Sequence, residues 1–298
     1  MRIAVTGSSG LIGTALVDAL REDGHGVMRL VRKDPQGPDE VRWDPMGGVD
    51  TAALENLDAV VHLAGAGIGD RRWTAGYKKE LRDSRVTGTR TLAEALAGLD
   101  RRPRVMVSGS AIGFYGDTGD EEADESSRMG RGFLAEMTRD WEAAAQPAAK
   151  AGIRVVHPRT GIVLSRKGGI LGKVLPLFKL GLGGRLGDGR QWMSWISLHD
   201  QIAALRSLIE RDDIAGPVNL TSPEPVTNEE FTRALARSVG RPAPFTVPAF
   251  VLRTALDGFA DEGLLVCQRV RPARLADAGF TFRHPGLESA LETARRTR

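Results

Sequence analysis

Short apolar runs and helix-like apolar repeats alternate along the first 160 residues. The runs have the length and β-branched composition of strands buried on both faces, and they lie near 3–5, 26–31, 57–63, 105–107 and 153–158. Between some of these runs, apolar residues recur at helical spacing, near 11–20, 71–98 and 133–150. Strand, turn and helix in this repeated order predict an α/β fold: a doubly wound parallel sheet with right-handed crossovers.

The pattern changes near residue 165. Glycines become frequent over residues 168–189. Beyond them, helices are predicted near 199–210, 228–239, 248–257 and 285–296, with a short strand near 218–220. The predicted division is a sheet domain over 1–165, completed by parts of 190–222, and a smaller lobe formed mainly by 166–298. We expect this lobe over the carboxyl ends of the strands, where ligands bind in such folds.

A glycine-rich turn joins the first strand to the first helix. Gly7, Gly10 and Gly13 follow the strand at spacings of three. Glycine tolerates the tight reversal, lets the backbone approach a pyrophosphate at Gly10, and lets the helix pack closely on the strand at Gly13. The helix N-terminus would then face the phosphates with its partial positive charge. The pattern predicts a dinucleotide site of the Rossmann type; an ordinary glycine-containing loop is the alternative.

The end of the second strand bears on which nicotinamide cofactor is bound. In dinucleotide folds an acidic residue there binds the 2′-hydroxyl of NAD, whereas a cation suits the 2′-phosphate of NADP. Here the position holds Arg32 with Lys33 beside it, and Asp34 comes too late to serve as the acid. A guanidinium fork matches a phosphate. We therefore expect NADP(H) as cofactor; a solvated charged loop is the alternative.

Composition narrows the class of protein. Hydrophobic residues make up 41% of the 298 residues and charged residues 27%, as in soluble globular proteins. The net charge of +3 comes from scattered basic residues, so no nucleic-acid partner is expected. The five histidines share no metal-binding spacing, so no metal site is predicted. A single cysteine, no apolar run of membrane-spanning length and no room for a signal peptide favour a cytoplasmic protein without a membrane partner.

Several motifs together point to a family. Residues 6–13 (TGSSGLIG), 62–65 (HLAG), 115–117 (YGD) and 157–161 (HPRTG) resemble the extended short-chain dehydrogenase/reductase family, nearest to its nucleotide-sugar-epimerase-like branch. Further stretches look like those of an NADP-dependent, epimerase-like subgroup, at 71–73, 141–142, 180–184 and 195–196. The segment 248–298 resembles the small C-terminal domain of that subgroup. The resemblance covers essentially the whole chain and implies a Rossmann-type fold.

The resemblance implies cofactor contacts position by position. Pyrophosphate contacts are implied for Gly7, Ser8, Ser9, Gly10, Leu11 and Ile12, and 2′-phosphate contacts for Arg32 and Lys33. Contacts along the rest of the cofactor are implied for Leu63, Ala64, Gly65 and Ala66, with Ser108 and Pro158 flanking the nicotinamide. Glu80 and Arg85 lie on the helix that touches the cofactor in the subgroup, although charged helix residues usually face water.

The family's proton-transfer pair is missing from the helix that should carry it. The family uses a Tyr whose hydroxyl exchanges a proton, and a Lys four residues later that lowers its pKa. Residues 132–139 read GFLAEMTR and contain neither. The family's active-site Ser or Thr falls on Ala111. Tyr115 and Ser110 are the candidate catalytic residues, although a Tyr at this place is commonly structural and Ser110 is offset by one position.

Substrate contacts are predicted in the second half of the chain, at Arg159, Arg185, Trp192 and Trp195. The cations would meet an anionic group such as a diphosphate, and the tryptophans would stack on a base or sugar unless they pack inside the lobe. The predicted function is NADP(H)-dependent oxidoreduction or epimerisation of a small polar substrate, such as a nucleotide sugar. The alternative is a catalytically silent NADP(H)-binding sensor or scaffold. The resemblance also allows a homodimer through the helices near 75–97 and 133–150.

Overall fold

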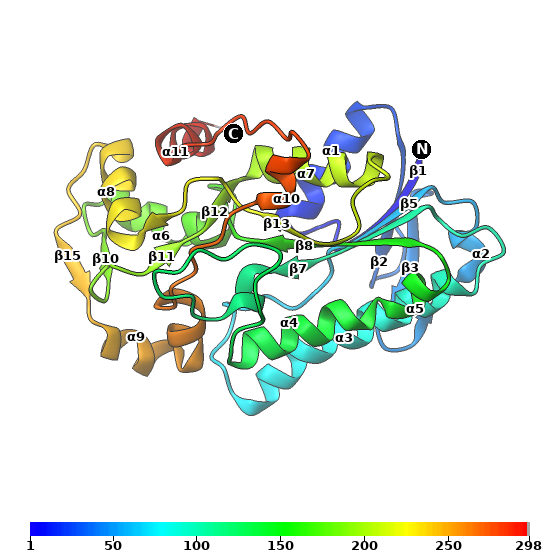
Figure 1. The fold of residues 1–298 in the computed structure, drawn as a ribbon, viewed down its shortest axis with the longest axis horizontal. Coiled ribbons are helices and arrows are strands. Elements are labelled where there is room, and N and C mark those ends of the chain that lie inside the picture. The colour runs from blue at the N-terminus through cyan, green and yellow to red at the C-terminus, as the bar shows by residue number, and fades with distance from the viewer. Residues whose placement is uncertain (297–298) are drawn as a thin grey trace.

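A single twisted sheet forms the centre of the molecule, and the computed structural model describes residues 1–296 (Figure 1). Its strands are β1 (Arg2–Thr6), β2 (Gly26–Val31), β3 (Glu40–Asp44), β4 (Gly48–Val49), β5 (Ala59–His62), β6 (Val105–Ser108), β7 (Ser110–Ala111), β8 (Arg154–Thr160) and β13 (Gly216–Leu220). The order across the sheet is β13–β8–β6–β5–β1–β2–β3–β4, and β7 pairs with β8. Every pair is parallel except β3 with β4. This arrangement confirms the predicted doubly wound parallel sheet.

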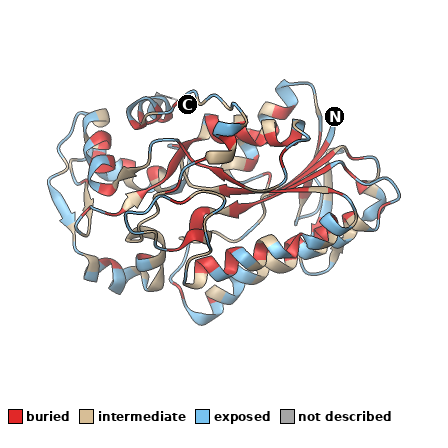
Figure 2. Cartoon of the chain, viewed as in Figure 1, coloured by how far each residue is buried: buried red, intermediate tan, exposed pale blue. Residues whose placement is uncertain are grey.

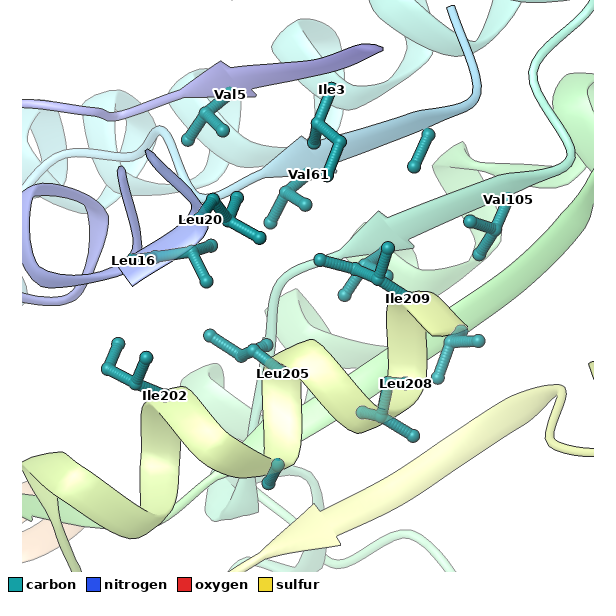
Figure 3. Close-up of a cluster of buried hydrophobic side chains, with 14 of the residues drawn as sticks. Ile3, Val5, Leu16, Leu20, Val61, Val105, Ile202, Leu205, Leu208 and Ile209 are labelled. Atoms are coloured by element: carbon teal, nitrogen blue, oxygen red, sulfur yellow. The ribbon is translucent and has the colours of Figure 1, made fainter. Parts of the chain in front are cut away.

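Helices cover both faces of the sheet, because alternate strand residues point to opposite sides. One face carries α1 (Leu11–Glu22) and α7 (Leu198–Glu210), and the other carries α3 (Ala75–Ala97), α4 (Phe133–Ala144) and α5 (Gln146–Lys150) (Figure 1). Ile3 and Val5 of β1 pack with Leu16 of α1 and Leu205 of α7 (Figure 3). Ala4 lies in the opposite core with residues of α3. The strands are accordingly buried between two helical layers (Figure 2).

The second lobe is built around β9 (Ile162–Leu164) and β12 (Trp195–Ser197), which pair in parallel. Its core also includes residues of α6 (Gly169–Lys179), α8 (Asn228–Val239) and α11 (Leu287–Arg296). Two more strand pairs are β10 (Gly184–Leu186) with β15 (Phe245–Val247), and β11 (Trp192–Met193) with β14 (Val226–Thr227). The remaining elements of this half are α9 (Ala249–Leu256), the π-helical turn η2 (Ala260–Leu264) and α10 (Ala273–Asp277).

The observed elements differ from the predicted ones in several places, among them α6, a helix in the glycine-rich stretch where none was predicted. The helix predicted over 71–98 begins only at Ala75, because the Thr74 side chain caps it by accepting a hydrogen bond from the Tyr77 N–H. The helix predicted over 133–150 is divided into α4 and α5, with Pro147, which lacks an N–H, in the first turn of α5. Residues 48–54, for which no element was predicted, hold β4 and α2 (Thr51–Leu54).

The chain returns to the sheet domain after the second lobe. Backbone hydrogen bonds join Thr118 to Cys267 at 2.8 Å and Ala123 to Arg269 at 2.8 Å. The Asn219 side chain of β13 donates to the Arg271 carbonyl at 2.9 Å. In Figure 1 the orange segment after α9 runs to α10, which lies beside β13 of the sheet. The last sixty residues are thus attached to both halves of the molecule.

Candidate functional site

The glycine turn between β1 and α1 leaves the start of the helix free for a ligand. Gly7 has a φ of +66°, and a Cβ there would lie 2.7 Å from the backbone of Leu63. A Cβ on Gly13 would overlap the carbonyl oxygen of Gly7. Gly10 is the N-cap of α1, no side chain caps the helix, and its first turn holds no acidic residue. Unsatisfied N–H groups at a helix N-terminus form an anion site.

Thr6 holds the loop that follows β5, residues 63–66, against this turn. Its hydroxyl oxygen accepts hydrogen bonds from the N–H groups of Leu63 at 3.1 Å and Ala64 at 3.2 Å. It also lies 2.7 Å from Nδ1 of His62. His62 is fully buried, and this burial lowers its pKa to about 4. His62 is therefore a neutral residue that orients the loop, as expected from its place in a strand.

The segments that follow Thr6 and His62 are partly exposed to solvent, as residues that contact a cofactor must be. Leu63, Ala64 and Ala66 are half-buried, and Gly65 is exposed. In the glycine turn, Ser9 and Gly10 are exposed, Leu11 and Ile12 are half-buried, and Ser8 is buried. The residues predicted to contact the pyrophosphate and those predicted to line the cofactor therefore lie on neighbouring loops, at the carboxyl ends of β1 and β5.

Arg32 and Lys33 follow β2 as predicted. Both are exposed, and neither forms an ion pair within the described residues. Asp34 is bound to Arg42 at 3.0 Å. Arg29, which the sequence analysis did not select, pairs with Glu40 at 2.8 Å and its Nε lies 3.5 Å from the Ser8 hydroxyl. Its position within the strand, between apolar neighbours, gave no sign of this contact.

Arg85 is buried without a carboxylate partner. Its guanidinium lies against Gly65, where a Cβ would approach within 3.3 Å, and 5.2 Å from the centre of the Trp141 ring. Its only hydrogen bond within the described residues goes to the Leu81 carbonyl at 3.2 Å, and its Nε has no partner. Burial lowers the pKa of Arg85 to about 10. Glu80 on the same helix is exposed and pairs with Arg71 at 3.3 Å.

Ser108 and Pro158 lie at the carboxyl ends of β6 and β8. Ser108 is fully buried, and its hydroxyl has no hydrogen-bond partner within the described part of the chain. Pro158 is buried one residue before Arg159. A buried hydroxyl without a partner is rare, and it is typical of a site that a ligand completes.

A buried polar network joins both predicted catalytic residues. Arg159 forms two hydrogen bonds to the Glu142 carboxylate, at 2.8 and 2.9 Å. Ser110 donates to the same carboxylate at 2.6 Å. The Tyr115 hydroxyl accepts from Arg159 at 3.0 Å and donates to Asn219 at 2.7 Å. Burial raises the pKa of Tyr115, and the charge of Arg159 opposes this rise.

In this network the hydroxyl groups of Tyr115 and Ser110, which proton transfer would use, are already hydrogen-bonded to other side chains of the protein. Tyr115 is 3% exposed and lies in the short 3-10 helix η1 (Ile112–Tyr115), rather than at the end of a strand. Arg159, predicted to contact substrate, is also buried and spends its guanidinium on Glu142 and Tyr115. Sequence patterns indicated Tyr115, Ser110 and Arg159 one by one, but did not indicate that the Glu142 carboxylate joins Ser110 and Arg159.

The other predicted substrate residues lie in different surroundings. Trp195 is fully buried and donates its N–H to the Glu224 carbonyl, so it packs in the lobe. Trp192 is half-buried, donates to Asp120 at 2.9 Å and lines a small cavity together with Ile162 and Gln268. Arg185 pairs with Glu229 at 3.7 Å and lines a separate groove beside α8.

Three potential metal ligands meet where the chain approaches its end. One ligand atom each of His199, Asp200 and His284 lies within 4.8 Å of the others. Spacing along the sequence did not indicate this cluster, because its members come from distant segments. The Asp200 carboxylate already accepts hydrogen bonds from Ser197 and from the N–H groups of Arg283 and His284. The cluster thus fastens the C-terminal segment to the start of α7.

Within residues 1–296, none of the helices has the length and apolar character that crossing a membrane would require.

Two family models match this chain. Residues 3–220 match the NAD dependent epimerase/dehydratase family, and residues 247–294 match a domain of unknown function (DUF1731). Epimerase family protein Mb2239 of Mycobacterium bovis is 50% identical over 290 residues, which cover 97% of this chain and 96% of the relative.

Two solved structures extend the comparison. Human epimerase family protein SDR39U1 (isoform 2), crystallised with NADPH, is 34% identical with a TM-score of 0.92, over 100% of both chains. A nucleoside-diphosphate sugar epimerase from Corynebacterium glutamicum is 39% identical with a TM-score of 0.82, over 98% of this chain and 57% of that one. The resemblance to extended short-chain dehydrogenases/reductases is thereby confirmed, and this chain belongs to the NAD dependent epimerase/dehydratase family.

Proposed function

We propose that this chain binds NADP(H) and catalyses oxidoreduction or epimerisation of a small polar substrate, such as a nucleotide sugar. The observation that carries the proposal is the N-terminus of α1, which no side chain caps. At Gly7 and Gly13, on either side of it in the sequence, a Cβ would overlap neighbouring backbone atoms. The NADPH in the structure of the human relative supports the cofactor. Hydride exchange with the substrate is the chemistry that a nicotinamide supplies when it is bound.

The chain's own residues divide the work of holding this cofactor. The N–H groups that begin α1 would bind the pyrophosphate, while Arg32 and Lys33 would bind the 2′-phosphate. Leu63 to Ala66 would form an apolar floor. Ser108 and Pro158 would flank the nicotinamide, with the unpartnered Ser108 hydroxyl available for a hydrogen bond.

The choice of NADP(H) over NAD(H) should depend on Arg32. We expect Arg32→Asp to weaken NADPH binding by roughly ten- to a hundredfold, because charge-assisted hydrogen bonds contribute about 1.5–3 kcal/mol, while NADH binding changes little. Isothermal titration with both nucleotides measures this. Arg42→Gln is the matched control, since Arg42 is an exposed arginine already paired with Asp34. Equal affinities of the unmodified protein for NADPH and NADH would refute the assignment.

Arg85 supports an anionic ligand beside the loop that contains Gly65. A buried guanidinium without a carboxylate costs free energy unless an anion or a hydrogen-bond acceptor reaches it. Arg85 lies against Gly65, on the loop proposed to line the cofactor, so a bound NADP(H) is the ligand that this site favours.

We expect Arg85→Met to separate stability from binding. The free energy of unfolding of the unliganded protein should stay equal or rise by about 1 kcal/mol, because an unpaired buried charge is removed. The affinity for NADPH should fall by roughly tenfold or more. Urea denaturation and NADPH titration give the two values. Arg82→Met is the control, since Arg82 lies on the same helix, half-exposed and paired with Asp140. A clear loss of stability without loss of affinity would assign Arg85 to the fold instead.

The second candidate function is a catalytically silent NADP(H)-binding protein. It is favoured by the opening of α4, where Leu134 and Thr138 are buried and neither Tyr nor Lys is present. Tyr115 and Ser110 stay predictions for proton transfer, each with its hydroxyl bonded inside the network. Following nicotinamide absorbance with aldehydes, quinones and nucleotide sugars distinguishes the two functions, because the silent protein would bind NADPH without oxidising it.

A further inference from the structure

A cavity of about 110 Å³ lies where the sheet domain meets the C-terminal segment. One wall is formed by η1 and the opening of α4, through Gly113 and Leu134. The opposite wall is formed by Glu262, Val266 and Gln268. A smaller cavity beside it shares Val266 and Gln268 and continues to Ile162 and Trp192. Both cavities lie beyond the carboxyl ends of β7 and β8, where ligands bind in open α/β sheets.

Three carboxylates, those of Asp117, Asp261 and Glu262, line this cavity together with Arg131. Glu262 is the one that is hydrogen-bonded to the opening of α4. It lies in η2, and its Oε2 accepts a hydrogen bond from the Leu134 N–H at 2.8 Å. The approach depends on a glycine: Gly132 has a φ of +105°, and a Cβ there would lie 2.8 Å from the same oxygen. Glu262 has no ion pair within the described residues, whereas its neighbour Asp261 pairs with Arg253 at 2.8 Å.

The start of α4 is also where this chain lacks the family's Tyr and Lys. The Leu134 N–H, part of the positive end of the helix dipole, holds the Glu262 carboxylate at this point. A neutral acceptor in the wall is the side-chain amide of Gln268, whose nitrogen donates weakly to the Ile112 and Gly116 carbonyls at 3.4 and 3.3 Å. Its side-chain oxygen accepts no hydrogen bond from the described residues, so both groups offer acceptors to hydroxyl donors.

We propose that residues 262–268 complete the substrate site and that Glu262 is its proton acceptor, for a substrate that presents neutral hydroxyl groups to this wall. The inference rests on the proposed NADP(H) function. In the oxidation, the substrate O–H proton moves to the Glu262 carboxylate. A bound NADP⁺ would accept the electron pair of the carbinol C–H bond as hydride, and the C–O bond would become C=O. The reverse transfers reduce the carbonyl.

The test uses the full-length protein and needs no known substrate. Oxidised nicotinamide carries a positive charge that reduced nicotinamide lacks, so a nearby carboxylate favours NADP⁺. We expect Glu262→Gln to raise the ratio of the NADP⁺ to the NADPH dissociation constant by about threefold or more. Asp261→Asn, in the same cavity wall, should leave the ratio within about twofold because its charge is already paired. The glutamine oxygen can still accept from Leu134, so the helix cap and the fold should be retained, as circular dichroism would verify.

The outcomes separate this inference from the proposed function. An unchanged ratio in folded Glu262→Gln would overturn the proposed role of Glu262, because a proton acceptor for this oxidation has to lie within electrostatic reach of the nicotinamide. Failure of the unmodified protein to bind either nucleotide would overturn the proposed function itself. UDP-glucose and glucose serve as substrate probes: where the unmodified protein reduces NADP⁺ with either, Glu262→Gln should lower kcat by about a hundredfold or more. An unchanged kcat there would overturn the proton-acceptor role.

Discussion

Replacing Arg159 with methionine should lower the free energy of unfolding by about 3–5 kcal/mol, the usual cost of breaking a buried ion pair. The side chains of Arg159 and Glu142 are only 4% and 13% exposed. The change would leave the Glu142 carboxylate buried with only the Ser110 hydroxyl as donor, and would leave Tyr115 without its donor. Urea denaturation at neutral pH measures the loss.

A double variant shows whether the loss of stability comes from the unpaired charge of Glu142. Glu142→Leu combined with Arg159→Met removes both charges and should recover most of the lost stability, because an apolar pair can replace a buried ion pair at little cost. Should the single variant cost less than about 1 kcal/mol, the pair would not hold β8 to α4 as described, and the earlier assignment of Arg159 to substrate would gain weight.

Gly13→Ala should disrupt the cofactor turn and destabilise the protein by about 3 kcal/mol. The added methyl group would overlap the backbone carbonyl of Gly7, which cannot move aside as a flexible side chain can. Relief requires α1 to move away from β1, which would open the apolar core around Leu16 and misplace the N–H groups proposed to bind pyrophosphate. Thermal unfolding and NADPH titration should both register the change.

Gly10→Ala is the matched comparison. A Cβ at Gly10 would lie 3.3 Å from the Gly7 carbonyl, a tight contact that small shifts relieve. This variant should keep most of the stability but bind NADPH less tightly, because its methyl group would stand at the face proposed to approach the pyrophosphate. Equal stability of the two variants would contradict the account of Gly13 as the position of close helix–strand packing.

Features set by neighbouring residues could be predicted from the sequence. The strand, glycine turn and helix over residues 2–22 depend on local spacing, and the structure has all three. Likewise, β2 ends at Val31, so Arg32 directly follows the second strand, the position that contacts the adenosine ribose in dinucleotide folds. The parallel sheet followed from the alternation of strands and helices, because crossover connections constrain topology strongly.

Contacts between distant segments could not be predicted in the same way. Glu142 lies on α4, the helix that lacks the family's Tyr and Lys. Its pairing with Arg159 depends on how α4 packs against β8, which the sequence does not specify. Glu262 approaches Leu134 from a segment more than a hundred residues later. The burial of Arg85 could not be predicted either, because charged residues on a helix usually face water.

The attachment of the last sixty residues to both halves has a consequence for synthesis on the ribosome. All strands of the parallel sheet are present once β13 has been made, so the nucleotide half can assemble while the chain is still growing. Residues 262–268, which wall the cavity, emerge later and bond back to η1 and to the loop after it. The nascent protein would therefore acquire the proposed nucleotide surface first and the proposed substrate wall later.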